Sequence, residues 1–238
     1  MKIAIIGYGK MGHEIEKILV NRGHEITLRS TTKTPFKAED LLGTDVAIEF
    51  SRPDAVVDNL YKCFAAKCSV VVGTTGWYGR LPEVKTEAEK AGIGLLYATN
   101  FSIGVNVLFH LNEKLARIMD AVEGYEPGIV EIHHLQKLDK PSGTAITLAE
   151  GILGNYSHKK KWVNEISNVD DELTIVSKRE GEVPGTHVVN YTSSADHISL
   201  VHQAENRSGF ARGAVMAAEW LKGKKGIFTM KDVLKFND

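Results

Sequence analysis

The sequence predicts an α/β fold, with a Rossmann-type doubly wound parallel sheet and a second α+β domain built on a mostly antiparallel or mixed sheet. Over the first hundred residues, short apolar runs alternate with segments of helical periodicity, and a glycine-rich turn follows the first run. Beyond residue 101 the pattern changes to strand-like runs joined by Gly, Pro and Ser turns. We therefore expect a dinucleotide-binding domain at 1–101, completed by a helical region at 209–238. A substrate-binding and oligomerisation domain is expected at 102–208, between hinges near residues 101 and 208.

The composition of the 238 residues is that of a globular protein, with 43% hydrophobic and 25% charged residues. The net charge is -1 and no charged tail is present, so we expect neither nucleic acid nor a membrane as partner. The apolar runs are too short to span a bilayer, and "MKIAII" breaks into glycines too early for an export signal. Cys63 and Cys68 are five positions apart, which matches neither a zinc nor a redox motif. We predict no metal site and two reduced thiols in a cytoplasmic protein.

The opening stretch carries the signature of a dinucleotide site. The continuous apolar run at 2–6 predicts a strand covered on both faces, and a helix of period 3.6 follows until Gly23. A second strand is predicted at 25–30, so a full G-x-G-x-x-G motif lies between a strand and a helix. The motif consists of Gly7, Tyr8, Gly9, Lys10, Met11 and Gly12. Its glycines allow a tight turn, close approach of a pyrophosphate and packing of the helix on the strand.

The end of the second strand indicates which nucleotide is bound. NAD-selective sites usually carry an acid there, but no acid occurs between Ile26 and Ala38. The segment "RSTTK" instead supplies the guanidinium of Arg29 and several hydroxyls, which favour the 2′-phosphate of NADP. A solvated loop that tolerates either cofactor is the alternative.

Three further strands are predicted at 45–51, 68–76 and 93–102, with helices at 52–67 and 81–91 between them. The carboxyl ends of strands in such a sheet face the ligand crevice, so the small polar residues at these ends are candidates for the nicotinamide side. These residues are Ser51, Arg52, Gly73, Thr74, Thr75, Ala98, Thr99 and Asn100.

The second domain is predicted to begin with an amphipathic helix at 102–119, which carries Asn112 as the one polar residue on its apolar stripe. A strand at 127–136, a helix at 143–153 and several strands between 172 and 203 follow. A final helix at 208–221 is expected to pack back on the first domain.

The segment "VEIHHLQKLDKPSGTAI", residues 130–146, places two adjacent histidines, a lysine, an aspartate and a Ser-Gly-Thr turn close together in the second domain. An imidazole exchanges protons near neutral pH, an ammonium binds carboxylates, and a Ser-Gly-Thr turn that opens a helix offers N–H groups to an anion. This pattern predicts a site for an anionic, protonatable small molecule. The alternative is that one of the two histidines is merely packed or exposed, because consecutive strand residues face opposite sides.

Other residues near this segment are less informative. Glu131 or Asp139 could orient the histidines or the loop, and the spacing leaves both choices open. His187, His197 and His202 are predicted to have surface or interface roles.

Several motifs together resemble the dihydrodipicolinate reductase family over essentially the whole chain. The run E-x-H-H-x-x-K-x-D-x-P-S-G-T is far more specific than the glycine motif. The matching segments are "GYGKMG", "FSRP", "VVGTTGW", "NFSIGVN", "EIHHLQKLDKPSGTA", "REGEVPGTHVV" and "FARGAVMAAEWL".

The resemblance implies an NADPH- or NADH-dependent reductase that converts 4-hydroxy-tetrahydrodipicolinate, a cyclic dicarboxylate, to tetrahydrodipicolinate in diaminopimelate and lysine biosynthesis. It also implies a cytoplasmic homotetramer assembled through the second-domain sheet. His133 and Lys137 match the family's catalytic pair. His134, Ser142, Gly143 and Thr144 match its substrate-binding positions. Gly7 to Gly12, Arg29, Arg52, Gly73 to Thr75, and Ala98 to Phe101 match its cofactor contacts.

Two departures from the family pattern stand out. The family often has H-H-R-H-K, whereas Leu135 and Gln136 stand here in place of the arginine and third histidine. We expect weaker electrostatic attraction for a dianionic substrate, with unchanged catalytic residues. The segment between "RSTTK" and "DVAIEF" is short and shows no clear helix, which predicts a more open adenine side.

Two other functions are compatible with parts of the pattern. Sugar, amino-acid and homoserine dehydrogenases share the predicted architecture, but they lack the HHxxKxDxPSGT run. A non-catalytic NAD(P)-binding redox sensor would need a partner surface, and the near-neutral chain offers neither a basic patch nor a DNA-binding helix pair.

Overall fold

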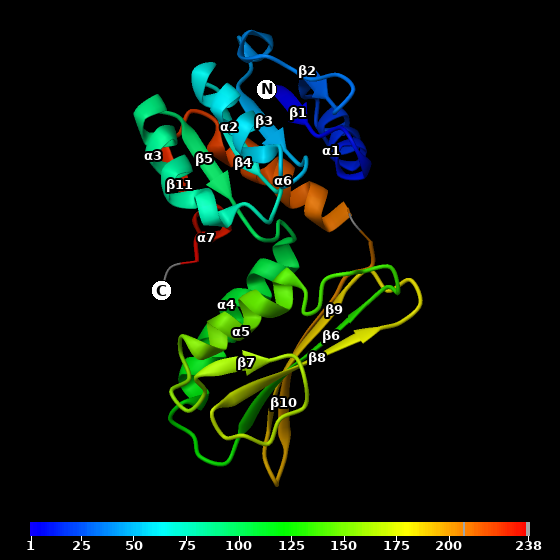
Figure 1. Cartoon of the computed structure of the whole chain (residues 1–238), viewed down its shortest axis with the longest axis vertical. Helices are drawn as coiled ribbons and strands as arrows, with labels where there is room; N and C mark the ends of the chain where they lie inside the picture. The colour runs from blue at the N-terminus through cyan, green and yellow to red at the C-terminus, as the bar shows by residue number, and fades with distance from the viewer. Residues whose placement is uncertain (207, 237–238) are drawn as a thin grey trace. The chain divides into compact units, whose positions relative to one another are not determined.

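The computed structural model describes residues 1–206 and 208–236, and these fall into two compact units. The first unit contains residues 1–102 together with the described residues from 208 onward, and the second contains residues 103–206 (Figure 1). Residue 207 and residues 237–238, which belong to the predicted second and first domains respectively, lie outside the described residues. Within the described residues, no helix is both long and apolar enough to cross a membrane.

The first unit is built on a six-stranded sheet in which every pair of neighbouring strands is parallel. This confirms the predicted Rossmann-type sheet. The strand order is β11-β5-β4-β3-β1-β2. The strands are β1 (Lys2–Ile6), β2 (Glu25–Ser30), β3 (Val46–Glu49), β4 (Ser69–Val72), β5 (Gly94–Tyr97) and β11 (Gly226–Phe228). Strand β11 was not predicted, because three residues are too few to show a period.

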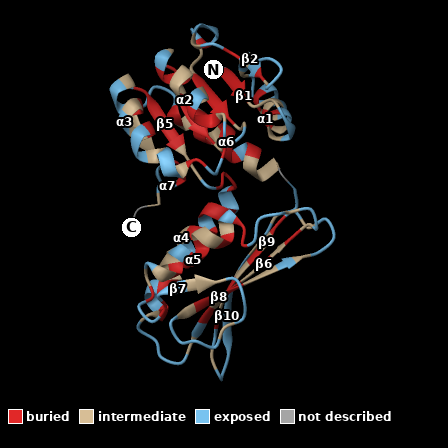
Figure 2. Ribbon diagram, in the orientation of Figure 1, coloured by how far each residue is buried: buried red, intermediate tan, exposed pale blue. Residues whose placement is uncertain are grey.

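Helices cover both faces of this sheet, which is why β1, β3, β4 and β5 are apolar without alternation, whereas the edge strand β2 alternates. One buried cluster joins the sheet to α2 and α3 through Leu60 and Val84, and the other joins it to α1 and α6 through Leu19 and Ala214. Figure 2 shows the resulting buried layer along the strands. The helices are α1 (Lys10–Asn21), α2 (Val56–Ala65), α3 (Leu81–Ala91), α6 (Ser208–Leu221) and α7 (Met230–Leu234), with 3₁₀ turns η1 (Ala38–Leu41) and η2 (Tyr78–Arg80).

The strand order fixes where a ligand crevice forms. The chain leaves β1 toward β2 on one side and later adds β3 on the other, so the direction of winding reverses between β1 and β3. Ligands of doubly wound sheets bind at such a switch point, outside the carboxyl ends of the strands. The glycine motif after β1 and the segment from Phe50 to Arg52 after β3 lie at these ends.

The second unit is a five-stranded mixed sheet, ordered β10-β9-β6-β8-β7, with two helices packed on it. Strands β10, β9 and β6 are antiparallel, whereas β6, β8 and β7 are parallel. The strands are β6 (Glu126–His133), β7 (Lys161–Val163), β8 (Glu172–Arg179), β9 (Thr186–Thr192) and β10 (His197–Gln203). The helices are α4 (Ile103–Met119) and α5 (Gly143–Leu153). The predicted mixed sheet is thus confirmed.

The core of the second unit lies between the sheet and its helices, and it includes Ile129, Leu148, Ile175 and Val189. Asn112 is buried within the contact between the two helices, where its Nδ2 donates to the carbonyl of Leu148 at 2.9 Å. This bond offsets part of the cost of burying the amide, although Oδ1 has no partner among the described residues.

Candidate active site

The turn after β1 has the backbone that only glycines permit. Gly7 has a φ of +90°, and a Cβ there would lie 2.1 Å from the carbonyl oxygen of Phe50. A Cβ on Gly12 would lie 2.8 Å from the carbonyl oxygen of Gly7, so a side chain would push helix α1 off the strand. Gly9 has open space where a Cβ would be, which leaves its backbone bare. These are the features that a dinucleotide cradle requires.

Two pockets lie along this turn. The first, of about 420 Å³, is lined by Gly7, Tyr8, Gly9, Ser30, Thr31, Thr32, Pro35, Phe36, Phe50, Ser51, Arg52, Ala55 and Asn59. The second, of about 430 Å³, is lined by Gly9, Lys10, Met11, Phe50, Ser51, Pro53, Gly73, Thr74 and Thr75. The ends of β1, β2, β3 and β4 therefore bring most of the predicted cofactor residues to one region of the unit.

The predicted residues after β5 lie differently. Neither of these two pockets has Ala98, Thr99, Asn100 or Phe101 in its described lining. Phe101 is buried in the core, and its carbonyl oxygen would lie 1.7 Å from a Cβ on Gly213 of helix α6. Asn100 is buried as well, and its Oδ1 accepts from the backbone N–H of Ser102 at 2.8 Å. Phe101 thus packs in the core beside helix α6, and Asn100 holds the backbone that follows β5.

Both predicted cofactor arginines are paired with acids. Arg52 binds Asp54 two positions along the chain, with Nε donating to Oδ1 at 2.9 Å. Arg29 binds Glu16 of helix α1, with Nε donating to Oε1 at 2.7 Å. Glu16 was not identified from the sequence, because thirteen residues separate it from Arg29 and only the packing of α1 beside β2 brings them together.

A buried acid, Glu49, supports the floor of the crevice at the end of β3. Its Oε1 accepts from the Ser51 hydroxyl and, at 3.3 Å, from Asn59 Nδ2, while Oε2 has no partner among the described residues. Burial raises the pKa of Glu49, although hydrogen bonds from Ser51, Thr74 and Asn59 oppose that change. The carboxyl group holds the Ser51–Arg52 segment and the Thr74 segment in one arrangement.

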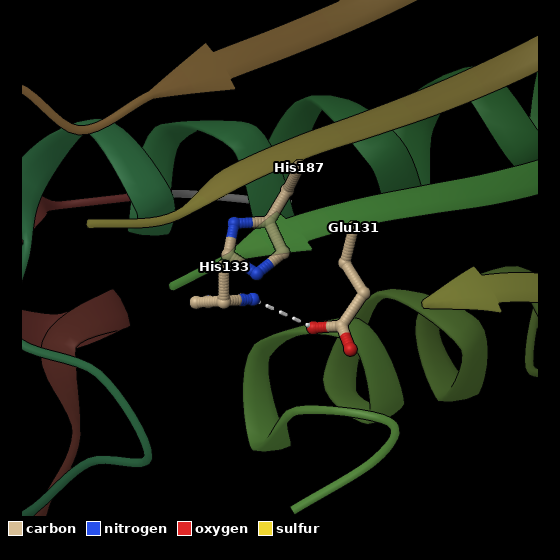
Figure 3. Close-up of side chains that lie close together, drawn as sticks. All are labelled: Glu131, His133 and His187. Atoms are coloured by element: carbon tan, nitrogen blue, oxygen red, sulfur yellow. Dashed lines mark ion pairs between the residues drawn. The ribbon is translucent and has the colours of Figure 1, made fainter. Parts of the chain in front are cut away.

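In the second unit, strand β6 carries Glu131 and His133 on the same face, because side chains two positions apart in a strand point the same way. Both are buried, with 0% and 7% of their surfaces exposed, and Nδ1 of His133 lies 3.1 Å from Oε2 of Glu131 (Figure 3). The sequence left open what Glu131 orients, and the structure answers that it contacts both the histidine and the following loop.

Glu131 is the centre of a network of donors. The Ser142 backbone N–H donates to both carboxylate oxygens at 3.2 Å, and the Arg179 guanidinium lies 3.3 Å from Oε1. Burial alone would raise the pKa of Glu131, but its interactions with His133, Ser142 and Ser177 lower the pKa well below its usual value. The group therefore stays ionised, and Arg179 supplies the charge that makes its burial tolerable.

His187 on β9 corrects the prediction of a surface or interface role for this residue. It is buried, with 4% of its surface exposed, and its ring meets the His133 ring edge-on at a centroid distance of 5.1 Å (Figure 3). Its Nε2 lies 3.3 Å from the Ser142 hydroxyl. Burial, followed by the neighbouring His133, lowers the pKa of His187 to about 3, so the ring is neutral at physiological pH.

The loop from His134 to Pro141 carries Lys137, and hydrogen bonds from Arg179 hold this loop in place. The Arg179 side chain donates to the carbonyls of Lys137 at 3.3 Å and Asp139 at 2.5 Å. The ammonium of Lys137 binds both carboxylate oxygens of Asp139 at 2.7 and 2.8 Å. Leu135, which replaces a basic residue of the family pattern, is 65% exposed.

Helix α5 begins at the end of this loop with Ser142 as its N-cap. The Ser142 hydroxyl accepts from the Ala145 N–H at 3.2 Å, as Ser commonly does at this position. Gly143 is exposed and Thr144 is half-buried, so the first turn is accessible to an anion.

One further glycine borders His133. A Cβ on Gly185 would lie 3.0 Å from Nε2 of His133, so this position leaves room in front of that nitrogen. The segment "REGEVPGTHVV" contains Gly185, His187 and Arg179, but no local spacing links them to His133.

The buried trio Glu131, His133 and His187 has ligand atoms within 4.8 Å of one another, a donor set that a metal ion could use. The charges argue against a cation there, because Arg179 already neutralises Glu131 and Lys137 lies on the adjacent loop. We assign no metal to this cluster.

Comparison with known proteins was made for the whole chain. Residues 1–101 match the family model of the dihydrodipicolinate reductase N-terminus, and residues 104–234 match that of the C-terminus. The chain belongs to the dihydrodipicolinate reductase family.

Individual relatives agree with this assignment. A 4-hydroxy-tetrahydrodipicolinate reductase of Christiangramia forsetii is 50% identical over 98% of each chain. A 4-hydroxy-tetrahydrodipicolinate reductase of Neisseria meningitidis serogroup B is 34% identical, over 94% of this chain and 85% of the relative. The solved structure of a dipicolinate-bound dihydrodipicolinate reductase from Paenisporosarcina sp. TG-14 aligns with a TM-score of 0.75 and 25% identity, covering 96% and 97% of the two chains.

Membership in the dihydrodipicolinate reductase family confirms the predicted family and favours an enzyme over a non-catalytic sensor. It also sets aside the dehydrogenases that act on other substrates. The first unit is accordingly a nucleotide-binding Rossmann domain.

Proposed function

We propose that the chain reduces 4-hydroxy-tetrahydrodipicolinate to tetrahydrodipicolinate with NADPH or NADH, in the diaminopimelate branch of lysine biosynthesis. The reductase activity follows from the family, and the proposal adds the residues that carry it out. The observation that supports these roles best is the buried Glu131–His133 pair beside Lys137 and the start of helix α5.

The glycine turn fits a dinucleotide, because Gly7 and Gly12 exclude side chains while Gly9 exposes backbone along both pockets. We assign the pyrophosphate to Gly7 through Gly12 and the start of α1, and the adenosine ribose to the segment beginning at Arg29. Arg52, the Gly73–Thr75 segment and Ala98 through Phe101 are assigned to the nicotinamide side. The bound nicotinamide supplies the hydride.

The substrate is a dicarboxylate, and the second unit offers three kinds of group to bind it. The first turn of α5, with Gly143 exposed and Thr144 half-buried, presents N–H groups to one carboxylate, and the buried Ser142 caps that turn. The Lys137 ammonium binds the other carboxylate in place of Asp139, and we assign His134 to the same substrate. Leu135 and Gln136 bring no charge, so Lys137 carries more of the attraction than in relatives with a basic run.

His133 is assigned the proton transfer. We assign the ring proton to Nδ1, which lies 3.1 Å from the Glu131 carboxylate, and Nε2 beside Gly185 is then the nitrogen left to exchange a proton with the substrate. Glu131 and His187 position the ring rather than react. The neutral His187 fills the space beside His133 without adding a competing charge.

The test is a spectroscopic assay of the purified protein with NADPH and separately with NADH. The substrate is generated in place from pyruvate and aspartate semialdehyde by the preceding synthase. Cofactor oxidation is expected to require the substrate, and to fall at least about 100-fold in His133→Ala and in Lys137→Ala. His158→Ala, which removes an exposed histidine from the turn after α5, is the matched control and is expected to keep full activity. Unchanged rates in either active-site variant would remove that residue from the mechanism.

The same proposal includes a cytoplasmic homotetramer built through the second unit. Strand β10 is at one edge of the described sheet, and its Val201 is 61% exposed. Exposed sheet edges are commonly covered by another copy in an assembly. Light scattering of the purified chain is expected to give a particle several times the 26.2 kDa of one chain, and a monomer would contradict the assembly.

A further inference from the structure

Helix α1 brings a carboxylate to the end of β2, where the sequence alone supplies only basic and hydroxyl groups. Glu16 Oε1 lies 2.5 Å from Nη2 of Arg29 and accepts from its Nε at 2.7 Å. The Tyr8 hydroxyl donates to Oε2 of the same carboxylate. We call these three residues the Tyr8–Glu16–Arg29 cluster.

The cluster borders the cofactor pocket. Tyr8 belongs to the lining of the first pocket together with Ser30, Thr31 and Thr32, which continue the chain directly after Arg29. The Arg29 guanidinium also lies 5.9 Å from the centre of the Tyr8 ring. Glu16 and Arg29 are not in the described lining, but the carboxylate is hydrogen-bonded to the lining residue Tyr8 and so lies next to the surface assigned above to the adenosine ribose.

The Glu16 carboxylate is ionised at neutral pH. Its pKa is lowered, first by the Tyr8 hydroxyl and next by Arg29, with a smaller contribution from His13 on the same helix. The pKa of Tyr8 is raised, mainly by Glu16, so the phenol stays a donor. At neutral pH the cluster thus consists of one anion, one cation and a neutral hydroxyl.

We propose that Glu16 is a specificity-determining residue for the nucleotide, and that it shifts the preference from NADPH toward NADH. The inference rests on the proposed function, because it assumes that the dinucleotide binds along the glycine turn. Glu16 provides, from a helix, the acid that NAD-selective sites normally place at the end of the second strand.

The physical argument depends on charge. A 2′-phosphate bound by Arg29 would share the guanidinium with Glu16 and lie within a few ångströms of its carboxylate, so two like charges would repel each other. The ribose of NADH instead presents neutral hydroxyls, which can donate hydrogen bonds to a carboxylate. Replacing Glu16 by Gln should therefore help NADPH, whereas NADH should change little because the amide oxygen still accepts from the ribose hydroxyls.

The opposite role has a different signature. If Glu16 instead held Arg29 in the orientation that a phosphate needs, its removal would weaken NADPH. The two roles predict changes of opposite sign, so one measurement separates them.

The experiment measures dissociation constants of NADPH and NADH for the purified full chain, by the fluorescence of the bound nicotinamide, without substrate. Glu16→Gln keeps the size of the side chain and one acceptor oxygen, and it removes the charge. We expect it to tighten NADPH roughly 3- to 30-fold at low salt, from Coulomb repulsion across a solvated surface, and to change NADH less than about twofold. The gain should shrink in about 0.5 M salt.

Glu14→Gln is the matched control, because Glu14 lies on the same helix and pairs with Lys17 at 2.7 Å. It is expected to leave both dissociation constants unchanged. Unchanged or weaker NADPH binding in Glu16→Gln would overturn the inference while leaving the proposed function in place. Failure of the unaltered chain to bind either nucleotide would overturn the proposed function itself.

Discussion

Nδ1 of His133 lies 3.1 Å from the carboxylate of Glu131, and both side chains are buried on one face of strand β6. This pair turns a flexible imidazole into a group of fixed orientation. Histidines that act in catalysis or bind metals are usually oriented by such a partner on the other ring nitrogen.

Glu131→Gln should separate positioning from binding. The amide keeps the shape but leaves the Arg179 guanidinium without its counter-charge, which should lower the free energy of unfolding by about 3 kcal/mol. We expect kcat to fall about 10- to 100-fold, with the dissociation constant of the nucleotide unchanged. The ¹⁵N shifts of the His133 ring should show loss of the Nδ1–H form, and an unchanged ring spectrum with normal kcat would contradict the positioning role.

His187 should make the protein sensitive to acid. Its pKa is about 3 in the folded protein and 6.5 in the unfolded chain, so the unfolded state binds the proton first as the pH falls. The stability that this group contributes is complete above pH 6.5 and is lost between pH 6.5 and about 3, at up to roughly 1.4 kcal/mol per pH unit.

His187→Gln keeps an amide near the place of Nε2 and has no such titration. Denaturant melts of both proteins between pH 7 and pH 4.5 are expected to show a shallower decline for the variant. His197→Gln, at an exposed position, serves as control and should follow the unaltered chain. Parallel pH profiles for the unaltered chain and His187→Gln would show that the ring is accessible to protons in the folded state.

Glu49 should have the opposite pH dependence. Its folded-state pKa is raised above the ordinary 4.5 because the side chain is buried, so ionisation disfavours the folded state. The associated stability is present below about pH 4.5 and is lost as the pH rises through the folded-state value.

Glu49→Gln keeps an acceptor for Ser51 and Asn59 and removes the charge. The variant should melt a few degrees higher than the unaltered chain at pH 8 and show no gain at pH 4. Differential scanning calorimetry at the two pH values measures this. Equal gains at both would mean that packing, not ionisation, is responsible.

Much of the site could be predicted from local sequence. The glycine motif specifies its own backbone, since Gly7 and Gly12 lie where a Cβ would meet backbone atoms, and such constraints act within a few residues. The run from Glu131 to Thr144 likewise brings its charged groups together by being one strand, one loop and one helix start. Strand β11 and strand β7 escaped prediction because three residues carry no measurable period.

By itself, the sequence determined most of the strands and helices, the glycine turn and the family signature, because each depends on residues that are neighbours in the chain. Tertiary structure alone decided which distant groups meet. His187 and Arg179 reach Glu131 and His133 because β9 and β8 pair with β6 on its two sides, and Glu16 reaches Arg29 because α1 packs beside β2. Strand pairing and helix packing follow from burial of the whole apolar surface, so no short segment encodes the partners that they bring together.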